Sequence, residues 1–363
     1  MSADPVAVEV TVAYALRRVG VIMTPDLANP DEIEGVLNPA TGRDADGGLY
    51  LLPRLVAAGN VSRVGLARVL VTDGVPSGVE RLGVVLAPDA GWERARTHAG
   101  VEDPRVTWIP ALNLHVMTYV AYGPLGPRSA IAISDDLRGW KRLGPIHFEY
   151  DEDLDTDLNL FCNKDIVFFG EPVPGPDGRP SFAALHRPMW DLDLVAPGIG
   201  SYLPAGVTDD RAGIWISYTP VDEATTDPSR LAHLRGHRLV AMPIHPFEQL
   251  KIGAGPPPLR VPEGWLLIHH GVSGRLIPGV DHQPMVHYAA GAMILSADDP
   301  SVVLARTSEP LLSAESEAET TGIVPNVVFP TAIEEVDGRH FVFYGMADSR
   351  IGVAEIERVG GTS

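Results

Sequence analysis

The feature that most constrains the fold is a short strand that recurs five times along the chain. Each copy is an apolar run rich in aromatic residues, often entered through a polar turn, as in "DGGLYLLPRL" and "DGRHFVFYGMAD". The reference positions lie at intervals of 65, 68, 83 and 76 residues: Leu49, Leu114, Phe182, Trp265 and Phe341. Each interval holds about four strands with turns, the content of one propeller blade. The sequence therefore predicts an all-β fold, a five-bladed β-propeller with a central pocket; the alternative is a pair of ordinary β-sandwiches.

Glycine and proline are scattered along the chain, which suits many short strands joined by turns. There are 37 glycines and 33 prolines among 363 residues, with no single tract that concentrates them. We expect one propeller domain over residues 31–358, after an N-terminal extension at 1–30 and before a C-terminal tail at 359–363.

Charge and cysteine content limit the partners and the compartment. The formal net charge of −19 argues against nucleic acid and anionic membranes as partners. Cys162 is the single cysteine, so an internal disulfide framework is excluded. The first residues lack the pattern of a signal peptide, and no apolar run has the length of a membrane span. We expect a soluble, cytoplasmic protein.

The recurring strand ends at a polar or charged side chain in each copy. These residues are Arg54, Tyr119, Arg187, His270 and Asp348. Equivalent positions on successive blades of a propeller face one channel, so we expect the five side chains to converge on a single funnel. The alternative is five unrelated surface residues.

Asp103 is the first candidate for chemistry. It lies in "GVEDPR", where Glu102 and Asp103 are followed by a proline and an arginine just before a β-rich run. Pro104 biases the preceding residue toward extended backbone, which would hold the Asp103 carboxylate in a fixed direction. The alternative is a plain Asp-Pro turn.

A set of cations near strand ends is the second candidate. Its members are Arg142, Lys164, Arg187, Lys251 and His270. In an acidic chain such cations indicate a local anion site, because arginine can hold a phosphate or carboxylate through two parallel hydrogen bonds and lysine adds a point charge. The alternative is ordinary ion pairing at the surface.

Several other site classes lack support. The prolines of "GAGPPP" remove the backbone donors that a nucleotide loop needs. The acidic run at 149–158 lacks the glycine and glutamate of a calcium loop and is interpreted as a solvated loop. No G-x-S-x-G, H-E-x-x-H or C-x-x-C pattern occurs. We expect neither a metal nor a cofactor.

Longer motifs carry a family resemblance. In order, they are "NPATG", "GVEDPR", "NKDIVFF", "LHRP", "KIGAGPPP", "GWLLIHHGV", "ARTSEPLL", "GIVPNVVFPTAI" and "YGMADSRIGVA". From about Asn38 to Ala354 the chain resembles glycoside hydrolase family 130. The resemblance implies a five-bladed propeller and, in most members, inverting phosphorolysis of β-mannosides; some members are β-1,2-mannosidases that use water.

The resemblance also implies roles for single residues. Asp103 is similar to the family's general acid, with Arg105 as a substrate-site residue that orients or charge-balances the acidic pair. The implied phosphate site consists of Arg142, Arg187, Lys251, His270 and Tyr288. The implied contacts to the mannosyl unit are Asn38, Arg54, Asp348 and, as a further candidate, Glu319.

Together these features predict a glycosyltransferase-type phosphorylase. It would cleave a β-mannosyl oligosaccharide with inorganic phosphate as co-substrate and release α-mannose 1-phosphate, and it could form a homo-oligomer. The alternatives are an inverting β-mannosidase and a non-catalytic sugar-binding propeller. The basic set favours phosphorolysis, because a hydrolase needs a carboxylate base instead. Three insertions, at 149–158, 171–184 and 277–285, and His269 in place of the family's usual tyrosine leave the acceptor sugar open.

Overall fold

The computed structural model describes residues 11–124, 126–193, 197–277 and 283–359. Residues 1–10 of the predicted extension, 360–363 of the predicted tail and 278–282 of the third insertion lie outside the described residues. Strands dominate the described ranges, and the helices there are short. The prediction of an all-β fold is confirmed.

Twenty strands form five antiparallel groups of four, numbered here in chain order. Group one contains β2 (Gly35–Arg43), β3 (Leu49–Ala57), β4 (Val61–Thr72) and β5 (Val75–Leu86). Group two contains β6 (Ala99–Ile109), β7 (Leu114–Gly123), β8 (Gly126–Ser134) and β9 (Lys141–Pro145). A short parallel pairing between β4 and β6 joins these two groups into one sheet.

The remaining groups repeat this order. Group three contains β11 (Cys162–Phe168), β13 (Pro180–Met189), β14 (Ile214–Pro220) and β15 (His233–Ala241). Group four contains β16 (Lys251–Ala254), β18 (Gly264–Gly274), β19 (Val286–Leu295) and β20 (Val303–Arg306). Group five contains β21 (Val328–Val336), β22 (Arg339–Met346), β23 (Arg350–Arg358) and β1 (Tyr14–Met23).

Short elements fill the connections. The minor strands are β10 (His147–Phe148), β12 (Val173–Pro174) and β17 (Leu259–Val261). The helices are α1 (Val221–Thr226), α2 (Glu317–Thr320) and the 3-10 turns η1 (Gly91–Glu93), η2 (Leu158–Leu160), η3 (Pro228–Ala232) and η4 (Pro246–Glu248). In the part of the chain that the structure describes, no helix has the length and apolar character needed to cross a membrane.

Five hydrophobic clusters connect the groups in cyclic order. One cluster lies between groups one and two, and the next three join groups two to three, three to four and four to five. The fifth cluster packs group five against group one, through residues such as Phe343 and Leu51. Each group therefore packs on two neighbours.

Alternating side chains in one strand explain how a group faces both neighbours. In β13, Phe182 and Ala184 belong to the cluster shared with group two, whereas Ala183 and Leu185 belong to the cluster shared with group four. Successive side chains of a strand point to opposite faces of the sheet. The continuous apolar run "FAAL" is thus the pattern of a strand buried on both faces.

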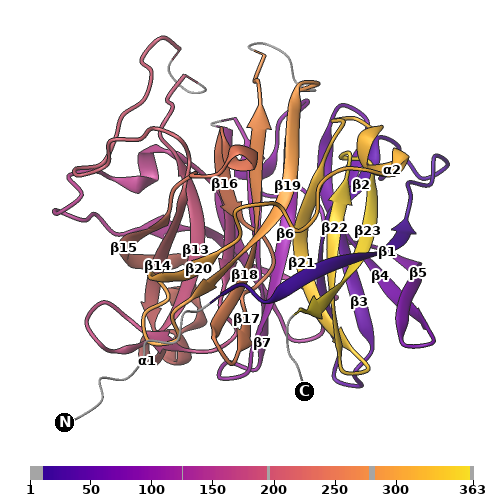
Figure 1. Ribbon diagram of the computed structural model, residues 1–363, viewed down its shortest axis with the longest axis horizontal. Helices are drawn as coiled ribbons and strands as arrows, with labels where there is room; N and C mark the ends of the chain where they lie inside the picture. The colour runs from indigo at the N-terminus through magenta and orange to yellow at the C-terminus, as the bar shows by residue number, and fades with distance from the viewer. Residues whose placement is uncertain (1–10, 125, 194–196, 278–282, 360–363) are drawn as a thin grey trace.

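The two ends of the chain meet in group five. Strand β1 pairs in antiparallel orientation with β23, from Tyr14 opposite Arg358 to Met23 opposite Ile351. Figure 1 shows the indigo β1, which pairs with the yellow β23. Strand pairing therefore begins at Tyr14, inside the segment 1–30 that the sequence analysis treats as an extension.

The five recurring strands are the second strands of their groups. The reference positions fall in β3, β7, β13, β18 and β22. The second strand lies between the first and third strands of its group and is therefore paired on both sides. Its central position explains why its sequence is the most apolar part of each repeat.

Candidate active site

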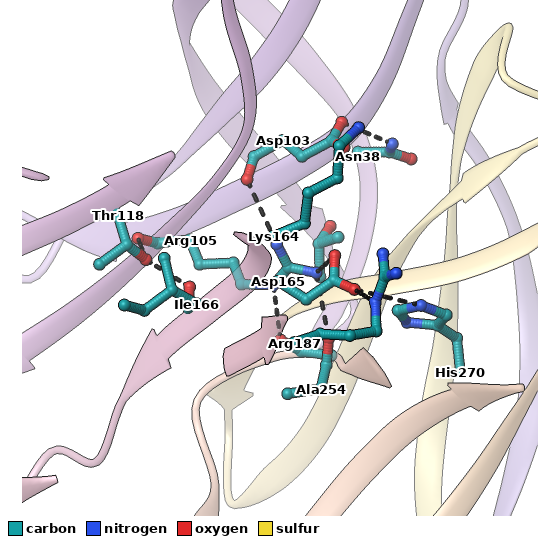
Figure 2. A network of polar contacts seen from close by, with 12 residues as sticks. Asn38, Asp103, Arg105, Thr118, Lys164, Asp165, Ile166, Arg187, Ala254 and His270 are labelled. Carbon is teal, nitrogen blue, oxygen red and sulfur yellow. Dashed lines mark hydrogen bonds and ion pairs between the residues drawn. The ribbon is translucent and has the colours of Figure 1, made fainter. Parts of the chain in front are cut away.

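A polar pocket of about 200 Å³ lies where the first two strands of the groups come together. Its lining residues are Asn38, Arg54, Asp103, Lys164, Asp165, Arg187, Met189, Lys251, His270, Tyr288, Val327, Phe329 and Asp348. Nine of the residues that the sequence marks as site candidates are among them: Asn38, Arg54, Asp103, Lys164, Arg187, Lys251, His270, Tyr288 and Asp348. Figure 2 shows how several of these side chains point toward one another.

β-Bulges direct three polar side chains of the pocket. Asn38, Asp103 and Asp165 have φ values of 40°, 48° and 56°, each at a register shift in the first strand of its group. Asparagine and aspartate tolerate this left-handed backbone better than most residues, and a bulge re-aims a side chain out of the regular alternation. The prediction that Pro104 holds Asp103 in extended backbone is wrong, because the bulge sets its direction.

The two carboxylates of the "GVEDPR" motif share one guanidinium. Arg54 donates to Asp103 Oδ1 through Nη1 and to Glu102 Oε1 through Nη2, both at 2.9 Å. Asn38 Nδ2 donates to the same oxygen of Asp103 at 2.8 Å (Figure 2). Burial raises the pKa of Asp103, but Arg54, Lys164 and the hydrogen bonds outweigh burial and hold the pKa below its usual value. Asp103 is therefore ionised in the ligand-free pocket.

Asp348 has the opposite electrostatic environment. Burial, together with the negative charges of Asp103 and Glu102, raises the pKa of Asp348 to about 6, although Arg54 acts against this shift. The backbone at Asp348 is also left-handed, with φ 48°. The pocket thus holds two carboxyl groups whose proton affinities are shifted apart.

Asp165 organises the cationic side of the pocket. It accepts hydrogen bonds from Arg187 Nε at 2.5 Å and Arg105 Nη2 at 3.3 Å, and its Oδ2 lies 3.5 Å from His270 Nε2 (Figure 2). Burial opposes ionisation of Asp165, but the guanidinium groups of Arg187 and Arg105 hold its pKa far below its usual value. Sequence reasoning did not assign this residue a role, although "NKD" was among the motifs.

Two glycines make room for this arrangement. A Cβ on Gly253 would lie 2.2 Å from Asp165 Oδ2 and 2.5 Å from His270 Cε1. A Cβ on Gly345 would lie 2.1 Å from Asn38 Oδ1. Such distances exclude any side chain at either position unless the site residues move, so glycine is required for the observed placement.

Arg187 and His270 present polar atoms that the described residues do not satisfy. Arg187 Nη1 and both ring nitrogens of His270 are buried without a hydrogen-bond partner among them. Burial first, and then the cations Arg187 and Lys164, lower the pKa of Lys251 to about 7. Burial and the neighbouring cations lower the pKa of His270 well below its usual value, so its ring is neutral. Buried polar groups of this kind require a partner, and an anion of the size of phosphate would supply acceptors.

Arg105 lies behind the pocket and does not line it. Its side chain is 1% exposed. Besides Asp165, it donates to the carbonyl oxygens of Gly255 at 2.9 Å and Ala254 at 3.0 Å. Arg105 therefore joins β6 to β16 and holds Asp165, in place of the substrate contact that was predicted.

Arg142 and Tyr119 also lie outside the pocket. Arg142 Nε and Nη2 donate to the buried Glu93 carboxylate at 2.9 and 3.0 Å, and the Tyr119 hydroxyl donates to it at 2.7 Å. Glu93 precedes β6, whereas Arg142 lies in β9. The ion pair therefore fastens the fourth strand of group two to the segment before its first strand. The structure does not bring Arg142 to the predicted phosphate site or Tyr119 to the predicted funnel.

Glu319 forms an ion pair like that of Glu93. This buried glutamate, in the segment before β21, accepts hydrogen bonds from Arg18 Nε of β1 at 2.9 Å and from the Tyr344 hydroxyl of β22 at 3.0 Å. It is not a lining residue of the pocket. Four groups contain this feature, which we name the Glu–Arg clamp: Glu32–Arg81, Glu93–Arg142, Glu248–Arg306 and Glu319–Arg18.

His269 belongs to the clamp of group four. Its Nε2 lies 2.8 Å from Glu248 Oε1, so it contacts the clamp glutamate as Tyr119 and Tyr344 do in their groups. The histidine that replaces the family's usual tyrosine is therefore a packing partner in this structure. Among the described residues, no group of three or more histidine, cysteine, aspartate or glutamate side chains is arranged to hold a metal ion.

Comparisons with known proteins agree with this arrangement. A family model described as beta-1,4-mannooligosaccharide phosphorylase, of glycoside hydrolase family 130, matches residues 232–359. The beta-1,2-mannobiose phosphorylase of Thermoanaerobacter sp. (strain X514) is 33% identical over 262 residues, covering 71% of this chain and 67% of the relative.

Solved structures share the fold. A beta-1,2-mannobiose phosphorylase from Listeria innocua superposes with a TM-score of 0.67 at 20% identity, over 95% of this chain and 96% of that chain. A family member described among glycoside hydrolases that target beta-1,2 mannosidic linkages in Candida mannan gives 0.66 at 22% identity, over 95% and 94%. With the sequence relative above, these findings show that the chain belongs to glycoside hydrolase family 130.

Proposed function

We propose that the five strand groups are the blades of a five-bladed β-propeller with the polar pocket on its axis. The cyclic order of the five hydrophobic clusters supports this architecture. The pairing of β1 with β23 would close the ring, since it completes the last blade with a strand from the start of the chain. The catalytic domain would then extend from β1 to β23.

The protein would be an inverting phosphorylase of β-mannosides that uses inorganic phosphate. The proposal depends on one pocket that holds both a candidate acid and a group of basic side chains. Asp103 lies beside Arg54 and Asn38 on one side. The basic side chains on the other side are Arg187, Lys251 and His270. A phosphorylase needs an acid for the leaving oxygen and an anion site where a hydrolase has its base. The related proteins act on β-1,2- and β-1,4-linked mannosides according to their descriptions.

In the proposed reaction, a phosphate oxygen attacks the anomeric carbon as the glycosidic C–O bond breaks. The leaving oxygen takes a proton that originates from Asp103, directly or through a sugar hydroxyl, and the products are α-mannose 1-phosphate and the shortened acceptor. Asp103 must be protonated to act in this way, whereas its pKa is low in the ligand-free pocket. Phosphate would bring negative charge into the same pocket, and a nearby negative charge raises the pKa of a carboxyl group.

The second candidate is an inverting β-mannosidase, because family members with hydrolase activity share this fold. A hydrolase needs a carboxylate that activates water. Asp165 is poorly suited, since Arg187 and Arg105 already occupy its oxygens. Asp348 would be the remaining carboxylate of the pocket for this role.

The products distinguish the two reactions. The protein is incubated with β-1,2- and β-1,4-mannobiose, with and without inorganic phosphate, and the products are separated. A phosphorylase yields one mannose 1-phosphate and one mannose per cleavage and no product without phosphate. Two mannose molecules per cleavage, formed equally well without phosphate, would establish the hydrolase.

A further inference from the structure

A second and larger cavity, of about 630 Å³, lies beside the polar pocket between groups two and three. Its walls come from η1, the end of β7, the beginning of β8, β10 and η2. The register of β6 and β7, with Gly100 opposite Tyr122, places the carboxyl end of β7 at the end of the sheet where Glu102 and Asp103 lie. The cavity and the pocket are therefore at the same end of the strands.

Carbon atoms dominate the surface of this cavity. Its large apolar contributors are Trp92, Ile146, Phe148, Leu158 and Phe161. Trp92 is 39% exposed, so its ring is accessible at the rim, whereas Phe148 and Phe161 are buried in the wall. The polar pocket has the opposite character, since charged side chains make up most of its lining.

Several polar side chains in the wall already bind other parts of the protein, and the wall also includes Arg128 and His147. Ser129 Oγ donates to the Asn163 carbonyl oxygen at 3.0 Å, and Asn163 Nδ2 lies 3.1 Å from His186 Nδ1. Asn159 accepts from the Phe148 N–H at 2.9 Å and donates to the Phe148 carbonyl oxygen at 2.6 Å. Ser129 Oγ and the Asn159 amide are thus occupied, whereas Asn163 Oδ1 is buried without a partner among the described residues and can accept one hydrogen bond from a ligand.

Two strands carry neighbouring residues into the pocket and the cavity. In β11, Asn163 lines the cavity and Lys164 lines the polar pocket. In β7, Gly123 lines the cavity, and the ring of Tyr122 has the Lys164 ammonium 5.8 Å from its centroid. Neighbouring residues of β11 thus line the cavity and the pocket on the side of Glu102, whose carboxylate lies 4.0 Å from Lys164 Nζ.

The leaving group would depart on the Glu102 side of the pocket. In an inverting reaction the nucleophile and the leaving group occupy opposite faces of the sugar. The candidate acid Asp103 belongs to group two, which forms a wall of the cavity, whereas Lys251, His270 and Tyr288 belong to group four. A group attached to the leaving oxygen can therefore extend toward the cavity while phosphate approaches from group four.

We propose that this cavity binds an apolar part of the leaving group, so that the substrate is a β-mannoside with an alkyl, acyl or aryl aglycone. The proposal rests on the proposed function for the orientation of the mannosyl unit. The size of the cavity is within the range of pockets that enclose small apolar ligands.

The test is the binding of methyl, butyl, hexyl and octyl β-D-mannopyranoside to the full-length protein, measured by titration calorimetry. Each methylene that enters the cavity should strengthen binding about three- to fourfold, which is the effect of burying one CH₂ group. Hexyl mannoside should therefore bind at least ~30-fold more tightly than methyl mannoside. Equal affinities along the series, or tighter binding of mannotriose without an alkyl effect, would overturn the proposal.

Matched variants locate the effect. Trp92→Ala should reduce the hexyl-to-methyl affinity ratio at least about fivefold while methyl mannoside binds as before. Trp108→Ala is the control, because Trp108 is 41% exposed but lines a different cavity. Gly91→Leu is a second variant: a Cβ there meets no atom within 4 Å, so the leucine can occupy space at the cavity and should also reduce the ratio. An unchanged ratio in both cavity variants, or an equal reduction in Trp108→Ala, would contradict the assignment.

This experiment is independent of the reaction. If the chain-length effect is present but no phosphorolysis of any mannoside occurs, the aglycone site stands and the proposed function fails. If mannobiose is phosphorolysed but the alkyl series binds uniformly, the proposed function stands and the aglycone site fails.

Discussion

Asp103 and Asp348 line the same pocket, but their pKa values are shifted in opposite directions. The pKa of Asp103 is lowered and that of Asp348 is raised. Arg54 donates one hydrogen bond to Asp103 and one to Glu102. Asp348 is buried near the negative charges of the same two carboxylates. Burial, together with the cations Arg187 and Lys164, lowers the pKa of Lys251 to about 7. Three residues of one pocket are therefore poised to change charge when a ligand brings or removes charge.

Asp103→Asn should abolish cleavage without loss of folding. An amide cannot deliver the proton, and loss of general acid catalysis costs roughly 10²- to 10⁴-fold in rate. Asparagine also tolerates the left-handed backbone at this position, where φ is 48°, so the bulge should persist. Rates are compared by mannose 1-phosphate release, with thermal unfolding as the control for folding. A rate within a few-fold of wild type would remove Asp103 from the mechanism.

Asp348→Asn should stabilise the fold while it impairs activity. A carboxyl group with a pKa of about 6 in the folded protein, against about 3.9 when unfolded, binds its proton more tightly in the folded state. This contribution to stability is present below pH 4 and is lost as the pH rises through 6. Asparagine does not ionise, so the variant keeps this stability at high pH. At pH 8 its free energy of unfolding should exceed that of wild type by on the order of 2 kcal/mol. Denaturant unfolding at pH 4 and pH 8 measures the difference; a variant less stable than wild type at pH 8 contradicts the assignment.

Lys251→Arg should remove a pH dependence of phosphate use. With a pKa of about 7, Lys251 is charged below neutral pH and loses its charge as the pH rises. At pH 8 about a tenth of the ammonium remains, so the KM for phosphate should rise up to about tenfold between pH 6 and 8. Arginine stays charged throughout, so the variant should show a flatter profile. Identical profiles in the two proteins would show that Lys251 does not titrate in this range.

Among the secondary-structure elements, β-bulges in the first strands direct polar side chains into the pocket. The Glu–Arg clamps hold the fourth strands in place. The bulges at Asn38, Asp103 and Asp165 lie in the first strands of groups one, two and three. Each clamp ties the fourth strand of a group to the segment before its first strand, as Arg142 does with Glu93. The bulges thus direct polar side chains of the first strands into the pocket, whereas the clamps hold the fourth strands in place.

Arg142→Gln should test the clamp. It leaves the buried Glu93 carboxylate without its cation, and breaking a buried ion pair costs about 3 kcal/mol or more. We therefore expect a lower melting temperature and a KM for phosphate that is unchanged within about twofold. The matched variant Arg187→Gln should show a raised KM for phosphate, because its guanidinium lines the pocket. A raised KM in Arg142→Gln would return Arg142 to the phosphate site.

The sequence predicts the strand repeat and most of the pocket, but not the clamps. The recurring strands are apolar because they are paired on both sides, and this pattern is visible without a structure. Arg142 and Glu319 resemble site residues because buried clamps and anion sites use the same charged side chains. Asp165 was missed because its importance depends on a bulge and on the close approach of Gly253, which only the packed strands reveal. The prediction that Tyr119 faces the funnel is wrong, because its hydroxyl group donates to Glu93 instead.

At the scale of the whole molecule, cyclic packing brings residues that are far apart in sequence into one pocket. Asn38 and Asp348 are separated by most of the chain, yet both line it. The clamp between Arg18 and Glu319 and the pairing of β1 with β23 fasten the beginning of the described chain to its end. Any loosening of this closure would move group one relative to group five and separate Asn38 from Asp348.

Phosphate, and not water, should occupy the cationic side of this pocket. The most direct measurement is the rate of cleavage of a β-mannobiose at fixed concentration as inorganic phosphate is varied, in wild type, Arg187→Ala and Lys251→Ala. Wild type should show saturable dependence on phosphate, and each variant should need roughly 10- to 150-fold more phosphate, the effect of losing one charge-assisted hydrogen bond. Cleavage by wild type at the same rate without phosphate, releasing free mannose only, would contradict the account.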